Sequence, residues 1–401
     1  MPRAGATGHA NDKMTIFVSL SAAAVAVSLF YYAAATVAAI RFAARASAPP
    51  LPLPKIPPRV AVLKPLHGKS NSLAANVVSF LEVAYPRLDF FFAVSDYEDP
   101  ATEIPVALRQ RYQFANITLV VGEEPGCSNR KIAKLIKMAE RAPKADIFVL
   151  SDADVSVDRD YLRRIVGELL ADEKTGIVTC AYRARPNGSL ASRFEAMYVN
   201  TDFIPQVLLA EMIEPMHYAL GATIAIKREA LEAIGGFSSL KNLLADDFYL
   251  GKAVTEHGYQ IKLSSALVTL ACEERTFSDF WHHQLRWART YRTVRPVSIA
   301  TILMHGPFWA LLLLAAARGK APAIATFVLV IAARLAMSAM ILGRVLKMPE
   351  ILNDLWMVPI KDLVMTGVWF ASLFSNKVTW AGRKFQLMRG GAMREVKTRA
   401  A

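Results

Sequence analysis

Two aspartates separated by one alanine follow a short apolar run, because Phe148-Val149-Leu150-Ser151 leads into Asp152-Ala153-Asp154. Such a run is typical of a buried parallel strand, and α/β sheets bind their ligands beyond the carboxyl ends of the strands. Two carboxylates this close need a metal or protons to neutralise them. They therefore indicate a Mg²⁺ or Mn²⁺ site shared with substrate phosphates. The alternative is a pair that caps the helix expected to begin near Tyr161.

Acidic residues recur at the ends of two other expected elements. Asp96 follows the apolar run Leu88–Ser95, and Asp246-Asp247 precede an expected helix. Taken alone, Asp96 is a common turn residue, and the Asp246-Asp247 pair could merely cap its helix. Acids at two different strand ends, Asp96 and Asp152, indicate a ligand site more strongly than either does alone.

The segment from Phe280 to Arg292 combines aromatic and basic residues. Read as a helix, it carries Phe280, Trp287 and Tyr291 on one side. The arginines Arg286, Arg289 and Arg292 lie on another side. A basic aromatic helix of this kind is typical of a membrane interface, and that role is compatible with phosphate binding.

The elements that position these residues alternate between strands and helices. Apolar runs predict strands at residues 60–63, 88–95, 117–121, 147–150, 176–181 and 222–226. Helices are predicted from Leu73, over Arg130–Arg141 and from Leu162. The alternation predicts an α/β domain with a mainly parallel, Rossmann-like sheet and helices on both faces.

Composition and charge favour a soluble domain with attached membrane segments over a nucleic-acid-binding protein. The 401 residues are 54% hydrophobic and carry a formal net charge of +13. No finger, RNP or helix-turn-helix signature accompanies that charge, so an anionic membrane surface is the expected partner and nucleic acid is not. The three cysteines lack metal-ligand spacing, which fits reduced thiols in a cytosolic compartment.

Apolar segments flank the predicted α/β domain. Residues 15–40 contain no charge and predict a transmembrane helix; a cleaved signal peptide is the alternative. By the positive-inside rule, the basic residues after this span place the following domain in the cytoplasm. We expect a multi-pass protein of a bacterial inner membrane. Three C-terminal segments, 299–317, 321–342 and 356–374, contain Arg334, Lys361 and Asp362. Four full spans conflict with the basic tail, so we expect 356–374 to be re-entrant or interfacial.

These boundaries divide the chain into seven parts. They are an N-terminal tail (1–14), a transmembrane helix (15–40), a Pro-rich linker (41–58), the α/β domain (59–276), an amphipathic interface helix (277–296), C-terminal membrane segments (297–376) and a basic tail (377–401).

Taken together, the motifs resemble the ceramide glucosyltransferases and the bacterial glycosyltransferases of hopanoid biosynthesis. The resemblance runs from about Val60 to Lys384. It rests on Leu63-Lys64-Pro65-Leu66-His67-Gly68, Asp96-Tyr97-Glu98-Asp99-Pro100-Ala101, Asn129-Arg130-Lys131, Asp152-Ala153-Asp154, Leu220-Gly221-Ala222, Ala245-Asp246-Asp247 and His283-Gln284-Leu285-Arg286-Trp287. The sequence departs from the family at His283, where the family has Gln or Arg.

This resemblance implies a GT-A fold that transfers a sugar, with inversion, from a UDP-sugar to a lipid hydroxyl, with a Mg²⁺ or Mn²⁺ ion on the diphosphate. Asp96 is expected to contact the uridine, Asp152 the ribose, and Asp152 with Asp154 the metal. Asp247 is expected to be the general base, and Arg286, on a helix fixed by Trp287, the clamp on the leaving diphosphate. The residues expected to bind substrate are Lys64, Asp96, Asp99, Lys131, Asp152, Asp246 and His283. For Lys131 the alternative is a solvated helix lysine.

Several alternatives stay open. The acceptor could be ceramide or a hopanoid, and the sugar glucose or N-acetylglucosamine. A processive polysaccharide synthase shares the fold and a similar Arg-Trp motif, but three C-terminal segments are few for a polymer channel. A non-catalytic scaffold that binds nucleotide-sugar is a third possibility. The number of true spans and the oligomeric state are not determined by the sequence.

Overall fold

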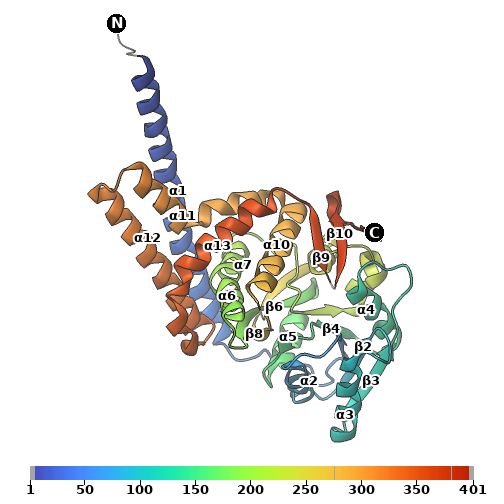
Figure 1. The fold of residues 1–401 in the computed structure, drawn as a ribbon. Helices are drawn as coiled ribbons and strands as arrows, with labels where there is room; N and C mark the ends of the chain where they lie inside the picture. The colour runs from blue at the N-terminus through green and yellow to red at the C-terminus, as the bar shows by residue number, and fades with distance from the viewer. Residues whose placement is uncertain (1–4, 275, 381, 397–401) are drawn as a thin grey trace.

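The protein consists of one α/β domain joined to a group of apolar helices. The structure is a computed structural model that describes residues 5–274, 276–380 and 382–396. A long helix, α1 (Gly5–Ala46), extends away from the α/β domain, and α11 (Gly306–Ala316) and α12 (Ala321–Met340) lie beside it (Figure 1). Its C-terminal half packs against the rest of the protein, where Tyr32, Ala35, Ala39 and Phe42 are buried.

An eight-stranded sheet forms the centre of the α/β domain. Its spatial order is β3-β2-β1-β4-β7-β6-β8-β5. The pairs β1–β2, β1–β4, β2–β3 and β6–β8 are parallel, whereas β7 runs antiparallel to β4 and β6, and β5 runs antiparallel to β8. The strands are β1 (Val60–Pro65), β2 (Leu88–Val94), β3 (Asn116–Val121), β4 (Ile147–Ser151), β5 (Val155–Ser156), β6 (Thr175–Pro186), β7 (Thr223–Lys227) and β8 (Gln260–Cys272). The mainly parallel α/β architecture is thereby confirmed.

The helices connect the strands and cover the sheet. In the α/β domain they are α2 (Leu73–Leu81), α3 (Glu103–Arg111), α4 (Arg130–Glu140), α5 (Tyr161–Leu170), α6 (Leu190–Tyr198), α7 (Ile204–Ile213), α8 (Arg228–Ala233) and α9 (Asp246–Glu256). They are followed by α10 (Phe277–Val294), α11 (Gly306–Ala316), α12 (Ala321–Met340) and α13 (Met357–Ser372). Helices α6 and α10 contact each other and both contact α13, so they join the sheet domain to the apolar helices (Figure 1).

Two helices in the described residues are long and apolar enough to cross a membrane. They are residues 12–46 of α1 and residues 321–345, which begin with α12. The predicted segment 299–317 is not one straight helix, because Pro296–Met304 and α11 meet at an angle of 59°. Pro307 at the start of α11 fits such a break, since proline cannot donate a backbone hydrogen bond to the preceding turn. Helix α13 has 16 residues and is not among the spans.

A buried group of four charges connects the apolar helices to the α/β domain. Arg334 of α12 donates to Asp362 of α13 (Nε to Oδ2, 2.8 Å) and to Asp202 between α6 and α7 (Nη2 to Oδ1, 2.9 Å). Lys361 pairs with Asp362 (2.6 Å) and with Asp202. Arg334, Lys361 and Asp362 are each at most 5% exposed. The charges predicted inside the C-terminal segments therefore neutralise one another.

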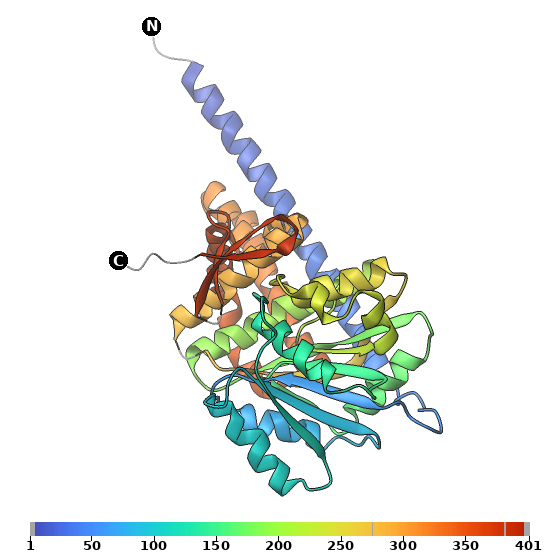
Figure 2. The same cartoon turned by 90° about the vertical axis from the view of Figure 1, so that its right-hand side faces the viewer.

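The described residues of the predicted basic tail, 377–380 and 382–396, contain a small antiparallel sheet. It contains β9 (Lys377–Trp380), β10 (Arg383–Leu387) and β11 (Met393–Glu395), in the order β11-β10-β9. Val378, Phe385, Leu387 and Met393 pack against Leu244, just before Asp246. Figure 2 shows this sheet against the α/β domain. Its basic residues are conspicuous in the sequence, but its apolar residues alternate with them and bury one face of the sheet.

Replacing Asp362 with Asn should destabilise the protein by about 3 kcal/mol or more, because it leaves two buried cations with one carboxylate. Thermal unfolding in detergent measures the change. The matched control is Glu256→Gln, which removes an exposed ion pair with Lys252 (3.8 Å) and should change stability by less than about 1 kcal/mol. Equal effects of the two substitutions would contradict a stabilising role for the buried group.

Candidate active site

One cavity of about 1030 Å³ extends from the ends of the parallel strands to the apolar helices. Residues after β1 and β4 line one part of it, including His67, Asp152 and Asp154. Residues of the C-terminal segments line another part, including Ile299 and Trp369. The cavity therefore gives access both to the carboxylates and to the membrane half of the protein.

A buried lysine holds the loop that carries Asp152 and Asp154. Lys64 of β1 is 0% exposed, and its Nζ donates to the backbone oxygens of Asp152 (2.6 Å) and Val155 (3.0 Å). Burial lowers the pKa of Lys64 to about 7, although the two aspartates act in the opposite direction. Lys64 does not line the cavity. It therefore fixes the backbone of the loop, and its predicted contact with substrate stays a prediction.

Lys131 of helix α4 lies between the carboxylates of Asp152 and Asp246. Lys131 Nζ lies 2.6 Å from Asp152 Oδ1 and 3.4 Å from Asp246 Oδ2. Asn129 caps α4 by accepting from Ile132 N (3.1 Å), and its amide donates to Leu243 O (2.9 Å). The Lys131 side chain is 18% exposed, and the two carboxylates raise its pKa against the effect of burial. The alternative of a solvated lysine is therefore wrong.

The Asp152-Asp154 pair has the chemistry of a cation site. Asp154 Oδ1 is buried and has no hydrogen-bond partner among the described residues. Burial, with the charge of Asp152, raises the pKa of Asp154 to about 7. An orphaned buried carboxylate oxygen beside a second carboxylate fits a hard divalent cation, which takes oxygen ligands. The helix-cap alternative does not hold, because α5 begins at Tyr161 after Asp160.

Asp247 lies in the first turn of α9 and lines the same cavity. Burial, followed by the charge of Asp246, raises its pKa to about 6, while Lys131 acts in the opposite direction. Gly221 leaves room for the carboxylate, because a Cβ at that position would lie 2.8 Å from Asp247 Oδ2. A carboxylate with such a pKa can accept a proton near neutral pH.

Helix α10 contributes the basic and aromatic wall of the cavity. His283, Arg286 and Trp287 all line it. Arg286 makes no ion pair within the described part of the chain, and burial lowers its pKa against the influence of Glu195. Burial also acts to lower the pKa of His283, but contacts with Glu195 and Glu274 outweigh it and raise the pKa to about 9.

Aromatic side chains that sequence reasoning missed surround Trp287. Phe203 lies 5.6 Å from Trp287 and stacks on Tyr182 at 5.3 Å (ring centroids). Tyr198 meets Trp287 edge-on at 6.3 Å. All four rings line the cavity. Of the aromatic residues around Trp287, only Tyr291 could be predicted from the sequence, because it follows Trp287 by four residues on the same helix. Tyr182, Tyr198 and Phe203 come from β6 and the α6–α7 region, far from Trp287 in the sequence.

Two predicted acids lie outside the cavity lining. Asp96 accepts from Glu98 N (3.1 Å) in a local turn. Asp99 accepts from Gly68 N (2.8 Å) and contacts His67 Nδ1 (2.9 Å), so it holds the loop after β1. The uridine contact of Asp96 and the substrate contact of Asp99 stay predictions. The structure does bring Lys131, Asp152, Asp154, Asp246, Asp247, His283, Arg286 and Trp287 to one cavity.

Known proteins share this architecture. The model of Glycosyl transferase family 21 matches residues 20–393. The chain belongs to Glycosyl transferase family 21.

Individual relatives of this family 21 chain have low sequence identity to it. Ceramide glucosyltransferase 3 of Caenorhabditis elegans is 26% identical over 58% of the chain and 50% of its own length. The probable glycosyltransferase YdaM of Bacillus subtilis is 25% identical over 58% of the chain and 55% of its own length. The chain thus spans about half the length of the curated relatives it matches. A mannosyltransferase from Pyrobaculum calidifontis, solved with GDP-Man and Mn²⁺, matches with a TM-score of 0.53 and 22% identity over 86% of this chain and 99% of its own, which shows the GT-A fold.

Mn²⁺ should raise the midpoint of thermal unfolding of the wild-type protein, and Asp154→Asn should abolish that rise, because a ligand of the folded state stabilises it. The rise should be larger at pH 8 than at pH 6, since the cation needs the ionised form of a carboxyl whose pKa is about 7. Asp158→Asn, at an exposed position nearby, is the control and should keep the rise. An undiminished rise in Asp154→Asn would remove this residue from the cation site.

Proposed function

We propose that this protein is a membrane-bound, inverting glycosyltransferase that moves a sugar from a UDP-sugar to the hydroxyl group of a lipid. The observation that carries the proposal is the single cavity lined by Asp152, Asp154, Asp247 and Arg286 and, farther along, by Ile299 and Trp369 of the apolar segments. One end suits a charged nucleotide-sugar. The other suits an acceptor that enters from a membrane.

The donor binds at the carboxylate end of the cavity. Asp154, with Asp152, would hold a Mg²⁺ or Mn²⁺ ion, which would offset the charge of the diphosphate as UDP leaves. Among the residues that the structure describes, Arg286 has no carboxylate within ion-pair distance, so its guanidinium is available for the phosphates. Lys131 keeps Asp152 and Asp246 in place. Trp287, packed against Phe203 and Tyr198, fixes the orientation of α10.

Asp247 is the general base for the acceptor. The acceptor oxygen attacks the anomeric carbon on the face opposite the diphosphate, a new carbon–oxygen bond forms, and the bond to the diphosphate breaks. The hydroxyl proton goes to the Asp247 carboxylate, and the electron pair leaves with UDP. The raised pKa of Asp247, about 6, suits a base that works near neutral pH.

The acceptor is a lipid, ceramide or a hopanoid, and the sugar is glucose or N-acetylglucosamine. The named relatives support ceramide and glucose. The hopanoid alternative rests on the motifs Leu220–Ile226 and His283–Thr290. In the proposed topology the protein crosses the membrane more than once, the α/β domain is cytoplasmic, and α13 lies at or re-enters the interface.

A processive polysaccharide synthase is the alternative enzyme. Poly-beta-1,6-N-acetyl-D-glucosamine synthase of Staphylococcus aureus is 19% identical over 57% of the chain. In the described residues, two helices, or three with the bent pair, are long and apolar enough to span a membrane, which is few for a polymer channel.

An assay with purified protein in detergent tests the proposal. UDP-glucose or UDP-N-acetylglucosamine is mixed with ceramide or a hopanoid, and released UDP is measured. Release should require both substrates and should stop after exhaustive EDTA treatment. Binding of the donor without UDP release under any acceptor condition would favour the non-catalytic scaffold, and activity after EDTA treatment would remove the cation from the reaction.

Asp247→Asn should lower kcat by at least about 10²-fold while donor binding is kept, because general-base catalysis contributes about this much. In the wild type, kcat/KM should fall as the pH drops below about 6, since the base must be ionised. Steady-state kinetics and calorimetry with UDP check both statements. Turnover that persists in Asp247→Asn would contradict the assignment.

Gly221→Ala should lower kcat by about tenfold or more, because the new Cβ would displace the Asp247 carboxylate, and misplacement of a catalytic group is costly. Gly343→Ala is the matched control, as a Cβ there meets nothing within 4 Å. Both variants are compared by UDP release and by thermal unfolding. A Gly221→Ala enzyme with wild-type kcat would show that this contact does not position the base.

A further inference from the structure

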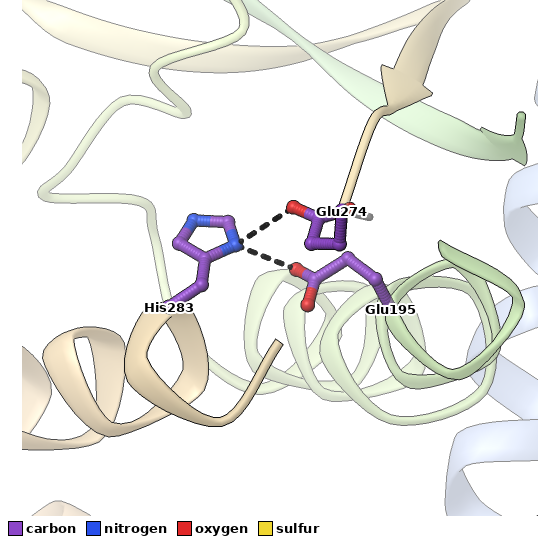
Figure 3. Close-up of side chains that lie close together, drawn as sticks. All are labelled: Glu195, Glu274 and His283. Atoms are coloured by element: carbon purple, nitrogen blue, oxygen red, sulfur yellow. Dashed lines mark ion pairs between the residues drawn. The ribbon is translucent and has the colours of Figure 1, made fainter. Parts of the chain in front are cut away.

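Three metal-ligating side chains from separate elements meet beside the proposed active site. They are Glu195 of α6, Glu274 after β8 and His283 of α10 (Figure 3). His283 Nδ1 lies 3.1 Å from Glu195 Oε1 and 3.3 Å from Glu274 Oε1. One donor atom from each residue lies within 4.8 Å of the other two. No two of these residues belong to the same helix or strand, so the fold itself assembles the group.

Two ion pairs hold His283 in this group, but they leave polar atoms of the group without hydrogen-bond partners among the described residues. His283 Nδ1 is buried and has no hydrogen-bond partner among the described residues, although two carboxylate oxygens lie at hydrogen-bond length. A ring N–H must point at its acceptor, and this one points at neither oxygen. Glu274 Oε2 is also buried and unpartnered. Two largely buried carboxylates require a positive charge between them, and a metal ion bound to the ring nitrogen can supply it in place of a protonated imidazole.

The spacing fits a tetrahedral metal ion. Zinc lies about 2.0–2.2 Å from imidazole nitrogen and carboxylate oxygen, so its ligand atoms are about 3.3–3.5 Å apart. The two separations from Nδ1, 3.1 and 3.3 Å, are close to that value. Gln284 Nε2 donates to both oxygens of Glu195 (2.8 and 2.9 Å) and so orients this ligand, as outer-sphere partners do in metal sites.

We propose that Glu195, Glu274 and His283 form a second cation site, selective for Zn²⁺, beside the Mg²⁺ or Mn²⁺ site at Asp152 and Asp154. One imidazole with two carboxylates suits zinc, whereas Mg²⁺ prefers oxygen ligands alone. Three protein ligands leave a fourth position open. Glu274 and His283 line the cavity and Glu195 does not, so the open position faces the cavity.

The number of zinc ions bound per chain, measured on the full-length protein in detergent, tests this site. The measurement does not require turnover, so its result is independent of the proposed function. The chelator-stripped protein is equilibrated with Zn²⁺ in excess Mg²⁺, which occupies the oxygen-only site, and bound zinc is measured by mass spectrometry of the metal. The wild type should bind about one zinc ion per chain, the expected stoichiometry of one three-ligand site. Co²⁺ in place of Zn²⁺ should give the visible absorption of a tetrahedral complex.

Single substitutions assign the ligands. Glu274→Gln and His283→Gln should each reduce bound zinc to background. His282→Gln is the matched control, because His282 is exposed on the same helix and should leave the zinc content unchanged. Size-exclusion profiles and circular dichroism check that each variant folds, and the wild-type count needs no variant. Absence of zinc from the wild type, or equal zinc in Glu274→Gln and the wild type, would overturn the site and leave a histidine paired with two carboxylates.

Discussion

The structure depends on the crowding of carboxylates around one cavity. Asp152, Asp154, Asp246 and Asp247 all line it, and mutual repulsion with burial raises the pKa of Asp154 and of Asp247. Lys131 neutralises part of this charge from α4. Such an arrangement is unfavourable by itself and becomes favourable when a cation and a diphosphate complete it. In the proposed mechanism, binding of the cation and the donor relieves the burial and the repulsion of these carboxylates.

The same cavity extends from these carboxylates to the apolar helices. Helix α10 carries Arg286 and Trp287 into the cavity and packs on α13. The buried charges of Arg334, Lys361, Asp362 and Asp202 fix α12 and α13 against the α/β domain. An acceptor that enters between the apolar segments would therefore reach the carboxylates without leaving the protein. This geometry supports the proposal of a lipid acceptor.

Much of the fold and part of the site could be predicted from the sequence. Buried parallel strands such as β1 and β4 are continuous apolar runs, and the acids that follow them mark the ligand-binding edge. Strand β8 was missed because Ser264 and Ser265 interrupt its pattern at an irregularity in the pairing with β6. Glu195 and Glu274 had no local signal, since their role arises only where α6, β8 and α10 meet. Asp96 and Asp99 matched a motif, and in the structure Asp96 accepts from Glu98 N while Asp99 holds the loop after β1, so their contacts with substrate stay predictions.

The most direct test of the central claim is the product formed in a living cell. The protein and its Asp247→Asn variant are expressed in a host that lacks glycolipids and is supplied with ceramide and hopanoid acceptors, and the extracted lipids are analysed by mass spectrometry. Our account predicts an acceptor lipid with a single added sugar in cells with the wild type and none in cells with the variant. A long glycan, or no sugar-modified lipid with the wild type, would contradict it.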